Sequence, residues 1–380
     1  MDDRIGTRRI DTDVVVVGAG PAGLAVAACV ARAGLTYRLF EREEQVAPSW
    51  RRHYDRLHLH TSRRFSGLPF LPMPRRYPRY PSRAQVVAYL EDYARSLGLT
   101  PELGVEVRKI EAAEPGWRVE TTIGTVTSAA VVVATGANGV PNLPEWPGLD
   151  GFPGPVLHSS AYRDGISFRG RDVLIVGLGN SGGEIALDLL EHGARPVLSV
   201  RSPVNVVPRD ILGLPILAIA IPLSRLPPML ADALVWPILR AYYPSYARLG
   251  LRKARHGPFR QIRERGRIPL LDIGTVREIR RGTIRVVGEV EHIAGSEVRF
   301  RDGGRRMVDA IVLATGFRSR PPAGVTAPDP VRPMRRSRPG PPDHLRYCGF
   351  YVSPTGMLRE IGREARLIAV QLRIGLRDRA

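Results

Sequence analysis

Two glycine fingerprints of the form GxGxxG constrain the fold of this chain most, because each follows an apolar run and opens a helical pattern. They are Gly18-Ala19-Gly20-Pro21-Ala22-Gly23 and Gly177-Leu178-Gly179-Asn180-Ser181-Gly182. The first glycine makes the strand-to-helix turn, the second lets backbone approach a pyrophosphate, and the third lets the helix pack against the strand. The pair predicts two dinucleotide-binding sites in one α/β chain.

The end of the strand after each fingerprint indicates which dinucleotide binds there. Glu41 lies about 20 residues past Gly18, where a carboxylate accepts hydrogen bonds from ribose hydroxyls, and this favours FAD. Arg201 and Ser202 stand at the matching place in the second unit, where they would attract a 2′-phosphate, and this favours NADPH. The alternative for Arg201 is a solvated arginine at a strand end.

The two halves of the chain also close alike. The apolar runs 131–136 and 311–316 both end in Ala-Thr-Gly, at Gly136 and Gly316. A strand that runs into a turn of small residues lets backbone pass close to a cofactor or cross between domains. The repeat is far too long for a solenoid and predicts two related Rossmann-like domains.

Composition excludes little beyond disorder, because 43% hydrophobic and 24% charged residues are ordinary for a globular protein. The net charge of +19 suggests nucleic acid or an anionic membrane as a partner. The basic residues are almost all scattered arginines, however, with Lys109 and Lys253 as the only lysines. We therefore attribute the charge to genome composition, predict no nucleic-acid partner, and expect the charge to draw in anionic substrates and NADPH.

Cys29 and Cys348 form no CxxC pair, which argues against a disulfide reductase and favours two small buried residues. The N-terminal stretch Met1 to Asp13 is polar and predicts no signal peptide. A reducing cytoplasm is the expected location.

An apolar insert at about 211–240 stands out in the second half. It carries no charge from Ile211 to Ser224 and is punctuated by prolines, so it is too short and too broken for a helix that spans a membrane. We prefer the wall of a substrate pocket between domains. The alternative is a surface that makes peripheral contact with a membrane or with a partner.

A long segment without a dinucleotide-binding pattern separates the first fingerprint from its closing strand. It contains Trp50, three histidines and a proline-rich loop, and a helix follows at 82–97 with Ser82 as N-cap and Gln85 at the capping-box position. His53, His58 and His60 have no acidic or cysteine partner at metal-ligand spacing, so we predict no metal site.

The stretch 152–162, with Phe152, Gly154, His158 and Tyr162, fits the pattern FxGxxxHxxx(Y/F). With the two fingerprints it resembles the class B flavin-containing monooxygenases. Further stretches resemble the YUCCA-type enzymes that act on indole-3-pyruvate, namely 54–60 (YDRLHLH), 89–94, 271–274 and 313–319. His60 falls where many flavin-containing monooxygenases have asparagine and YUCCA-type sequences have histidine.

The resemblance implies residue roles. FAD would be bound by Gly18, Gly20, Gly23 and Glu41, and NADPH by Gly177, Gly179, Gly182, Arg201 and Ser202. The predicted cofactor-binding set is completed by Gly136, His158, Asn180, Ser181 and Gly316. Trp50, His60 and Ser62 are the predicted catalytic residues, which would approach the flavin edge as hydrogen-bond donors or as a wall.

The resemblance also implies the chemistry. NADPH reduces FAD, dioxygen adds to the flavin, and the flavin peroxide oxygenates a small-molecule substrate while the protein supplies positioning and water exclusion. The YUCCA likeness favours decarboxylative oxygenation of an aryl 2-oxo acid. The alternative is N- or S-oxygenation in specialised metabolism, followed by an NADPH oxidase or a non-catalytic flavin redox sensor.

The expected layout is discontinuous. Residues 1–165 form the first part of the FAD domain, residues 166–318 form an inserted NADPH domain that carries the apolar insert, and residues 319–380 return to the FAD domain.

Overall fold

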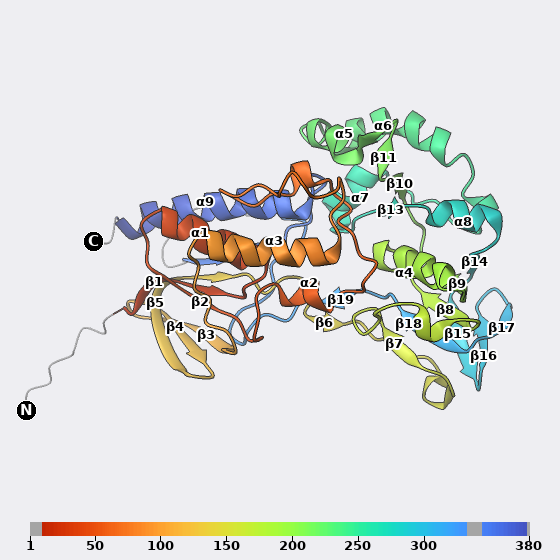
Figure 1. Ribbon diagram of the computed structural model, residues 1–380, viewed down its shortest axis with the longest axis horizontal. Helices are drawn as coiled ribbons and strands as arrows, with labels where there is room; N and C mark the ends of the chain where they lie inside the picture. Colours follow the sequence, from red (N-terminus) through yellow and green to blue (C-terminus); the bar gives the residue numbers. More distant parts are fainter. Residues whose placement is uncertain (1–9, 333–343, 378–380) are drawn as a thin grey trace, which may run out of the picture.

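Two sheets, one formed mainly from each half of the chain, organise the protein (Figure 1). This is a computed structural model, and it describes residues 10–332 and 344–377. The alternation of strands and helices confirms the predicted α/β class. The prediction of no signal peptide rests partly on residues 1–9, which lie outside the described residues.

The first sheet carries the first fingerprint. Its strands are β1 Thr12–Val17, β2 Tyr37–Phe40, β3 Val107–Ala113, β4 Gly116–Thr121, β5 Gly124–Val133 and β20 Leu345–Tyr347. Their order is β2-β1-β5-β4-β3, and β20 pairs in parallel with β5. Strands β1, β2 and β5 are parallel, whereas β3, β4 and β5 form an antiparallel meander. Because β20 comes from the end of the chain, the C-terminal part returns to the first sheet.

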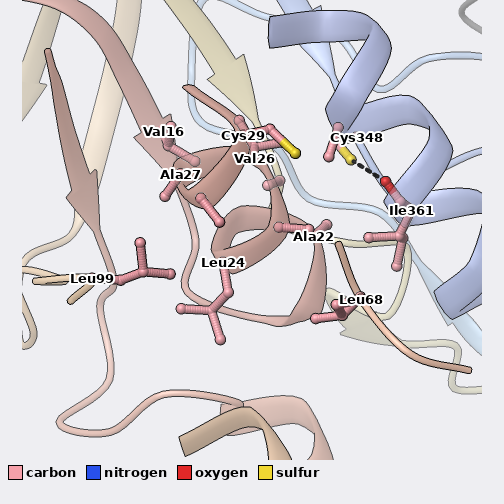
Figure 2. Close-up of a cluster of buried hydrophobic side chains, with 14 of the residues drawn as sticks. Val16, Ala22, Leu24, Val26, Ala27, Cys29, Leu68, Leu99, Cys348 and Ile361 are labelled. Atoms are coloured by element: carbon pink, nitrogen blue, oxygen red, sulfur yellow. Dashed lines mark hydrogen bonds between the residues drawn. The ribbon is translucent and has the colours of Figure 1, made fainter. Parts of the chain in front are cut away.

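Helices α1 (Pro21–Arg32), α3 (Arg83–Ser96) and α9 (Met357–Arg377) lie together on one side of this sheet (Figure 1). Helix α1 is buried along residues 22–30, because it packs between the strands and α9. Figure 2 shows this cluster, in which the Cys348 Sγ atom donates to the carbonyl oxygen of Ile361 at 3.8 Å. Cys29 and Cys348 are both free and buried, as predicted, and burial raises the pKa of the Cys29 thiol to about 11.

The second sheet carries the second fingerprint and is parallel throughout. Its order is β14-β9-β8-β18-β7, with β7 Val156–His158, β8 Asp172–Val176, β9 Arg195–Ser199, β14 Arg285–Val287 and β18 Ala310–Leu313. Helices α4 (Asn180–Glu191) and α8 (Thr275–Arg281) belong to this half. A small antiparallel sheet of β15 Val290–Ala294, β16 Glu297–Phe300 and β17 Arg305–Met307 follows β14.

The chain passes between the halves through two short strands that pair with each other. Strand β6 (Val140–Pro141) on the outward pass is antiparallel to β19 (Phe317–Arg318) on the return. Strand β7 already belongs to the second sheet, although it precedes the expected boundary at residue 165. The domain boundaries stay a prediction, and the second sheet begins before the expected one.

The apolar insert folds into two helices above the second sheet (Figure 1). They are α5 (Ile216–Leu223) and α6 (Pro228–Tyr242), and each has one proline in its interior, Pro222 and Pro237. The neighbouring elements are β10 Val206–Pro208, β11 Asp210–Ile211, β12 Leu214–Pro215, α7 Pro258–Arg265 and β13 Leu270–Asp272. Within the described residues, no helix combines the length and apolarity needed to cross a bilayer.

The remaining segments are short helices. Helix α2 (Pro48–Arg52) and the single-turn helix η1 (Arg63–Phe65) precede α3, whose predicted capping box is present: Gln85 N donates to the Ser82 hydroxyl and Ser82 N donates to the Gln85 side chain. Three further single turns are η2 Leu149–Gly151, η3 Ile166–Phe168 and η4 Ala247–Leu249.

Candidate functional site

The two fingerprint turns have the same backbone geometry. Gly18 and Gly177 adopt positive φ angles of +101° and +107°, a region that residues with a Cβ disfavour. A Cβ on Gly18 would lie 2.9 Å from the carbonyl oxygen of Ala134, and one on Gly177 would lie 2.6 Å from that of Ala314. Each turn is therefore packed against the closing strand of its own half, which explains why both closing strands end in a small residue.

The third glycines bring the helices close to these turns. A Cβ on Gly23 would lie 1.7 Å from the carbonyl oxygen of Gly18, and a Cβ on Gly182 would lie 2.0 Å from that of Gly177. No side chain fits at either position without moving the helix. These glycines are needed for packing, whether or not a ligand is bound.

The second glycines face open space. Gly20 and Gly179 are the N-cap residues of α1 and α4, and a Cβ on either would meet no atom within 4 Å. Neither helix has a side-chain cap or an acidic residue in its first turn. The first N–H groups of each helix are thus left for an anion, and the two cradles fit the pyrophosphates of FAD and NADPH.

Glu41 lies beside the first cradle and is 5% exposed. Its Oε2 atom accepts a hydrogen bond from the N–H of Ala19 at 2.7 Å, and Oε1 accepts one from Glu43 at 3.1 Å. Burial raises the pKa of this carboxyl group, and the two N–H donors partly oppose that shift. The carboxylate is therefore held at the fingerprint turn, where ribose hydroxyls of FAD would reach it.

Arg201 and Ser202 follow β9 and are exposed. The side chain of Arg252 donates to the carbonyl oxygen of Arg201, which orients the backbone and leaves the guanidinium of Arg201 in solvent. An exposed guanidinium past the second fingerprint strand fits a 2′-phosphate, and its role as a cofactor-binding residue stays a prediction.

An apolar cavity of about 300 Å³ lies between the two fingerprint helices. Pro21 and Asn180, the first residues of α1 and α4, both line it, together with Trp50 and His60. The insert supplies a continuous apolar wall, formed by Ile211, Ile216, Leu217, Ile219, Ala220, Val235, Ile238 and Leu239. The insert therefore lines a cavity, as the preferred interpretation requires, and the role of this cavity as the substrate pocket stays a prediction.

His60 is hydrogen-bonded at this cavity by a residue from the other half of the chain. Its Nε2 atom contacts the Oε1 atom of Glu184 on α4. The Glu184 side chain is 2% exposed, and its second oxygen has no hydrogen-bond partner within the described part of the chain. A buried carboxylate with an unused acceptor favours a proton on the facing nitrogen of the imidazole.

Helix α4 carries three acidic residues on one face, at the i, i+4 and i+7 positions. Besides Glu184, Asp188 accepts the Tyr162 hydroxyl at 2.6 Å, and Glu191 pairs with Arg56, with a shortest distance of 2.6 Å. Arg56 and His60 belong to the segment that precedes α3, in the first half of the chain. The acidic face of α4 thus fastens that segment to the NADPH-side helix.

The three predicted catalytic residues do not all meet at this cavity. Trp50 and His60 line it, whereas Ser62 lines a larger neighbouring cavity. The Ser62 hydroxyl is buried and has no hydrogen-bond partner in the described residues. The chain turns at Thr61, which does line the apolar cavity, so consecutive side chains point into different cavities.

The other histidines of this segment have different surroundings. His53 is half-buried, and burial lowers its pKa, while His58 Nδ1 contacts the carbonyl oxygen of Arg56 at 2.7 Å. In the ranges 10–332 and 344–377, no three His, Cys, Asp or Glu side chains are grouped as metal ligands would be.

His158 connects the end of β7 to the second closing turn. Its Nε2 contacts the carbonyl oxygen of Gly316 at 3.0 Å, its Nδ1 contacts the Ser160 hydroxyl at 2.9 Å, and its ring packs edge-on against Phe317. Burial lowers the pKa of His158. Both nitrogens are thus occupied by protein atoms. Gly136 and Gly316 have φ angles of +75° and +82° with open space at the Cβ position, which leaves room for a ligand.

Asn180 and Ser181 make protein contacts in the second turn. The Asn180 Oδ1 atom accepts from the N–H of Leu271 at 2.8 Å, and Ser181 is hydrogen-bonded to the buried hydroxyl of Tyr54. Both residues tie α4 to its surroundings, so their predicted contact with a cofactor remains to be tested.

Glu184 is the residue that sequence reasoning missed. Its signal was present, because it is the first charged residue of the helix that follows the second fingerprint, two positions after the last fingerprint glycine. A carboxylate at a position predicted to be buried indicates a specific partner.

Comparison with known proteins agrees with this geometry. Residues 15–208 match the family described as "Pyridine nucleotide-disulphide oxidoreductase". The chain is 44% identical over 331 residues to "Indole-3-pyruvate monooxygenase YUCCA1" of Oryza sativa subsp. japonica, with 85% of this chain and 82% of that protein covered. It is 40% identical to "Probable indole-3-pyruvate monooxygenase YUCCA4" of Arabidopsis thaliana, with 81% and 76% covered.

Among solved structures, the flavin-containing monooxygenase from Stenotrophomonas maltophilia has the same fold. The TM-score is 0.72 at 24% identity, and the match covers 97% of this chain and all of the other.

Proposed function

This chain belongs to the family of flavin-dependent monooxygenases that includes the YUCCA indole-3-pyruvate monooxygenases, and we propose that its own substrate is an aryl 2-oxo acid, oxygenated with loss of carbon dioxide. It is an enzyme that uses FAD and NADPH. The observation that carries the proposal is the apolar cavity, where the first residues of both fingerprint helices meet His60.

The residues assigned to each cofactor follow from the two cradles. Gly18, Gly20, Gly23 and Glu41 would hold FAD, and Gly177, Gly179, Gly182, Arg201 and Ser202 would hold NADPH. FAD, when bound and reduced by NADPH, would be the group that reacts with dioxygen. The first residues of both fingerprint helices line one cavity, so these two cradles would bring the two cofactors together at that cavity.

The insert supports an aromatic substrate. Its side chains make the cavity wall apolar, so an aryl group replaces water there at a gain of roughly 25 cal/mol per Å² of apolar surface. Excluding water also protects a reactive oxygen species from breakdown.

His60 is the polar group that we assign to the reacting end. With Glu184 accepting the proton of Nε2, Nδ1 is the nitrogen left for the cavity. In the neutral imidazole Nδ1 carries no proton, so it would accept a hydrogen bond from a protonated oxygen of the reacting group. Trp50 would limit the space beside it, and Ser62, which lines the neighbouring cavity, keeps only an indirect role in this proposal.

The reaction balances with the two cofactors. The bond between C1 and C2 of the 2-oxo acid breaks, one atom of dioxygen joins C2, and C1 leaves as carbon dioxide. The other oxygen atom is released as water, and NADPH supplies the two electrons with a proton. The product is the carboxylic acid one carbon shorter.

Labelled dioxygen tests the proposal. The purified enzyme with NADPH is offered aryl 2-oxo acids, amines and thioethers, and the products are identified by mass spectrometry. We expect an acid one carbon shorter that carries one labelled oxygen atom. If amines or thioethers are oxygenated and no 2-oxo acid is consumed, the enzyme is an N- or S-oxygenase and the decarboxylative proposal is wrong. Hydrogen peroxide as the sole product would indicate an NADPH oxidase.

The outer face of the insert supports peripheral contact with a membrane. Leu212, Met229 and Trp236 are 91%, 69% and 50% exposed, although Ile211 and Val235, next to two of them, line the cavity. We propose that this face touches a bilayer from the cytoplasm, a location consistent with two free buried thiols. Flotation with liposomes tests it, and Trp236→Ser should reduce the bound fraction; no flotation of the unmutated protein contradicts it.

A further inference from the structure

A second cavity lies against the far side of the apolar cavity's wall. Its volume is about 1290 Å³, and we call it the arginine groove. It is lined by the loop from Ser62 to Arg79, by residues 213–218 and by one side of α9. The two cavities share no lining residue, yet Leu217 and Leu358 line one while the adjacent Ala218 and Arg359 line the other. The groove and the cavity are therefore separated by a single layer of chain.

The charge of the groove has one sign. Seven arginines and no carboxylate line it: Arg63, Arg64, Arg75, Arg79, Arg359, Arg363 and Arg366. Within the described residues, only Arg79 and Arg363 have ion pairs, with Asp210 at 3.4 Å and Glu360 at 3.6 Å. The Nε atom of Arg359 is buried without a hydrogen-bond partner. This arrangement favours a bound anion, because guanidinium groups held together repel one another until an anion pairs with them.

The rest of the groove's lining consists mainly of apolar side chains, together with one hydroxyl group that has no hydrogen-bond partner in the described residues. Phe65, Leu68, Phe70, Leu71, Met73 and Leu214 contribute apolar surface. The Ser62 hydroxyl, from a residue that is 3% exposed, lacks a hydrogen-bond partner in the described chain. A ligand that satisfies this lining has an apolar body, an anionic group for the guanidinium groups, and an acceptor for the hydroxyl.

We propose that the arginine groove binds aryl carboxylates and collects the substrate beside the apolar cavity. This rests on the proposed function, since an aryl 2-oxo acid has both the aromatic body and the anionic head. A bidentate carboxylate suits the planar guanidinium fork of arginine, and a field of one sign raises the local concentration of anions. The groove would thus bind the substrate before the reaction and would contribute no reacting group.

Equilibrium binding tests this without turnover. Titration calorimetry of the FAD-loaded protein compares phenylacetate, which has no 2-oxo group to react, with the neutral phenylacetamide. The double variant Arg359→Gln, Arg366→Gln removes two unpaired guanidinium groups. Arg373→Gln is the matched control, because Arg373 is exposed on the same helix and lines neither cavity. Ile238→Trp narrows the apolar cavity and separates binding there from binding in the groove.

We expect the double variant to weaken phenylacetate binding by about tenfold or more, since a charge-assisted hydrogen bond contributes at least that factor. Arg373→Gln should leave it unchanged, Ile238→Trp should retain the part of the binding that the double variant removes, and phenylacetamide should bind weakly to all variants. Three results would overturn the proposal. The double variant could bind phenylacetate as tightly as the unmutated protein does, Ile238→Trp could be the only variant that loses binding, or phenylacetamide could bind as tightly as phenylacetate. Displacement by an equal concentration of inorganic phosphate would overturn it in favour of a phosphate site.

Steady-state kinetics distinguish a failure of the groove proposal from a failure of the proposed function. With an aryl 2-oxo acid as substrate, the double variant should raise KM with kcat unchanged, and an unchanged KM would contradict the groove's role. If no 2-oxo acid is consumed by the unmutated enzyme, the proposed function fails, whereas the phenylacetate titrations still decide whether the groove binds carboxylates. A melting curve followed by circular dichroism confirms that each variant is folded.

Discussion

His60 and Glu184 come from different halves of the chain, and the Nε2 atom of the histidine is hydrogen-bonded to the Oε1 atom of the glutamate. The histidine side chain is 17% exposed and lines the apolar cavity, while the glutamate is buried in the helix that follows the second fingerprint. The position and the hydrogen bonding of the imidazole therefore depend on the NADPH-side helix. A change in either residue should alter the reaction without removing a cofactor.

Replacing these two side chains should uncouple the enzyme. His60→Ala should lower the rate of oxygenated product by about a hundredfold, because a positioned proton donor or acceptor contributes at least that much. Glu184→Gln should produce a smaller loss, with hydrogen peroxide released in place of product. Glu191→Gln is the control, since it removes the Arg56 pair from the same helix without touching His60. Peroxide and product are measured against NADPH consumed, and equal coupling in Glu184→Gln and Glu191→Gln would contradict the assignment.

Substitutions of the fingerprint glycines should separate binding from folding. Gly20→Val should fold but lose FAD, because Gly20 has an ordinary extended backbone and open space at its Cβ. Gly23→Val should fail to fold, because its Cβ would collide with the backbone of Gly18. Absorbance spectra and melting curves measure the two effects. In parallel, Gly179→Val should keep FAD and lose NADPH binding. If a folded Gly20→Val protein still bound FAD, the assignment of the first cradle to FAD would be wrong.

Preference for NADPH over NADH should depend on Arg201. Arg201→Ala should remove a charge-assisted contact with the 2′-phosphate, at a cost of about 1.5 to 3 kcal/mol, and should raise KM for NADPH while leaving that for NADH unchanged. Arg195→Ala, at the other end of β9, is the control. Steady-state kinetics with NADPH and NADH measure the preference. If the unmutated enzyme used both nucleotides equally, Arg201 would have no role in recognising the 2′-phosphate.

FAD affinity should rise with pH through the titration of Glu41. Burial raises the pKa of Glu41 above its ordinary value of 4.5, so part of the free protein carries this group protonated in mildly acidic solution. Ribose hydroxyls donate to the charged form, so FAD binds that form more tightly and its affinity falls as the pH drops through the raised pKa. The fold of the free protein has the opposite dependence: the stabilisation from this group is present below 4.5 and is lost as the pH rises through the folded-state value. Fluorescence titration of FAD measures the first effect, and Glu41→Gln should abolish it.

Local patterns predicted the parts of this fold that depend on neighbouring residues. The fingerprint glycines, the two closing strands and the capping box of Ser82 each need a particular residue within one turn or strand, so the residue types reveal them. The uncharged composition of the insert likewise predicted a pocket wall.

Contacts between distant segments were not visible in the sequence. Glu184 meets His60 because α4 lies against the segment before α3, and no spacing rule relates the two positions. The family resemblance implied that Ser62 and His60 act together at the flavin edge, yet the two residues line different cavities on either side of Thr61. Strand β7 was placed in the first domain because its pairing partner, β18, comes much later in the chain.

The paired strands β6 and β19 form a two-stranded ribbon at the place where the chain passes between its halves. Since β6 lies on the outward pass of the chain and β19 on its return, both connections between the halves run through this ribbon, and any rotation of one half against the other would have to bend it. The same rotation would have to break two contacts of α4 with the segment before α3: the pair of the exposed Glu191 with Arg56 and the contact of the buried Glu184 with His60.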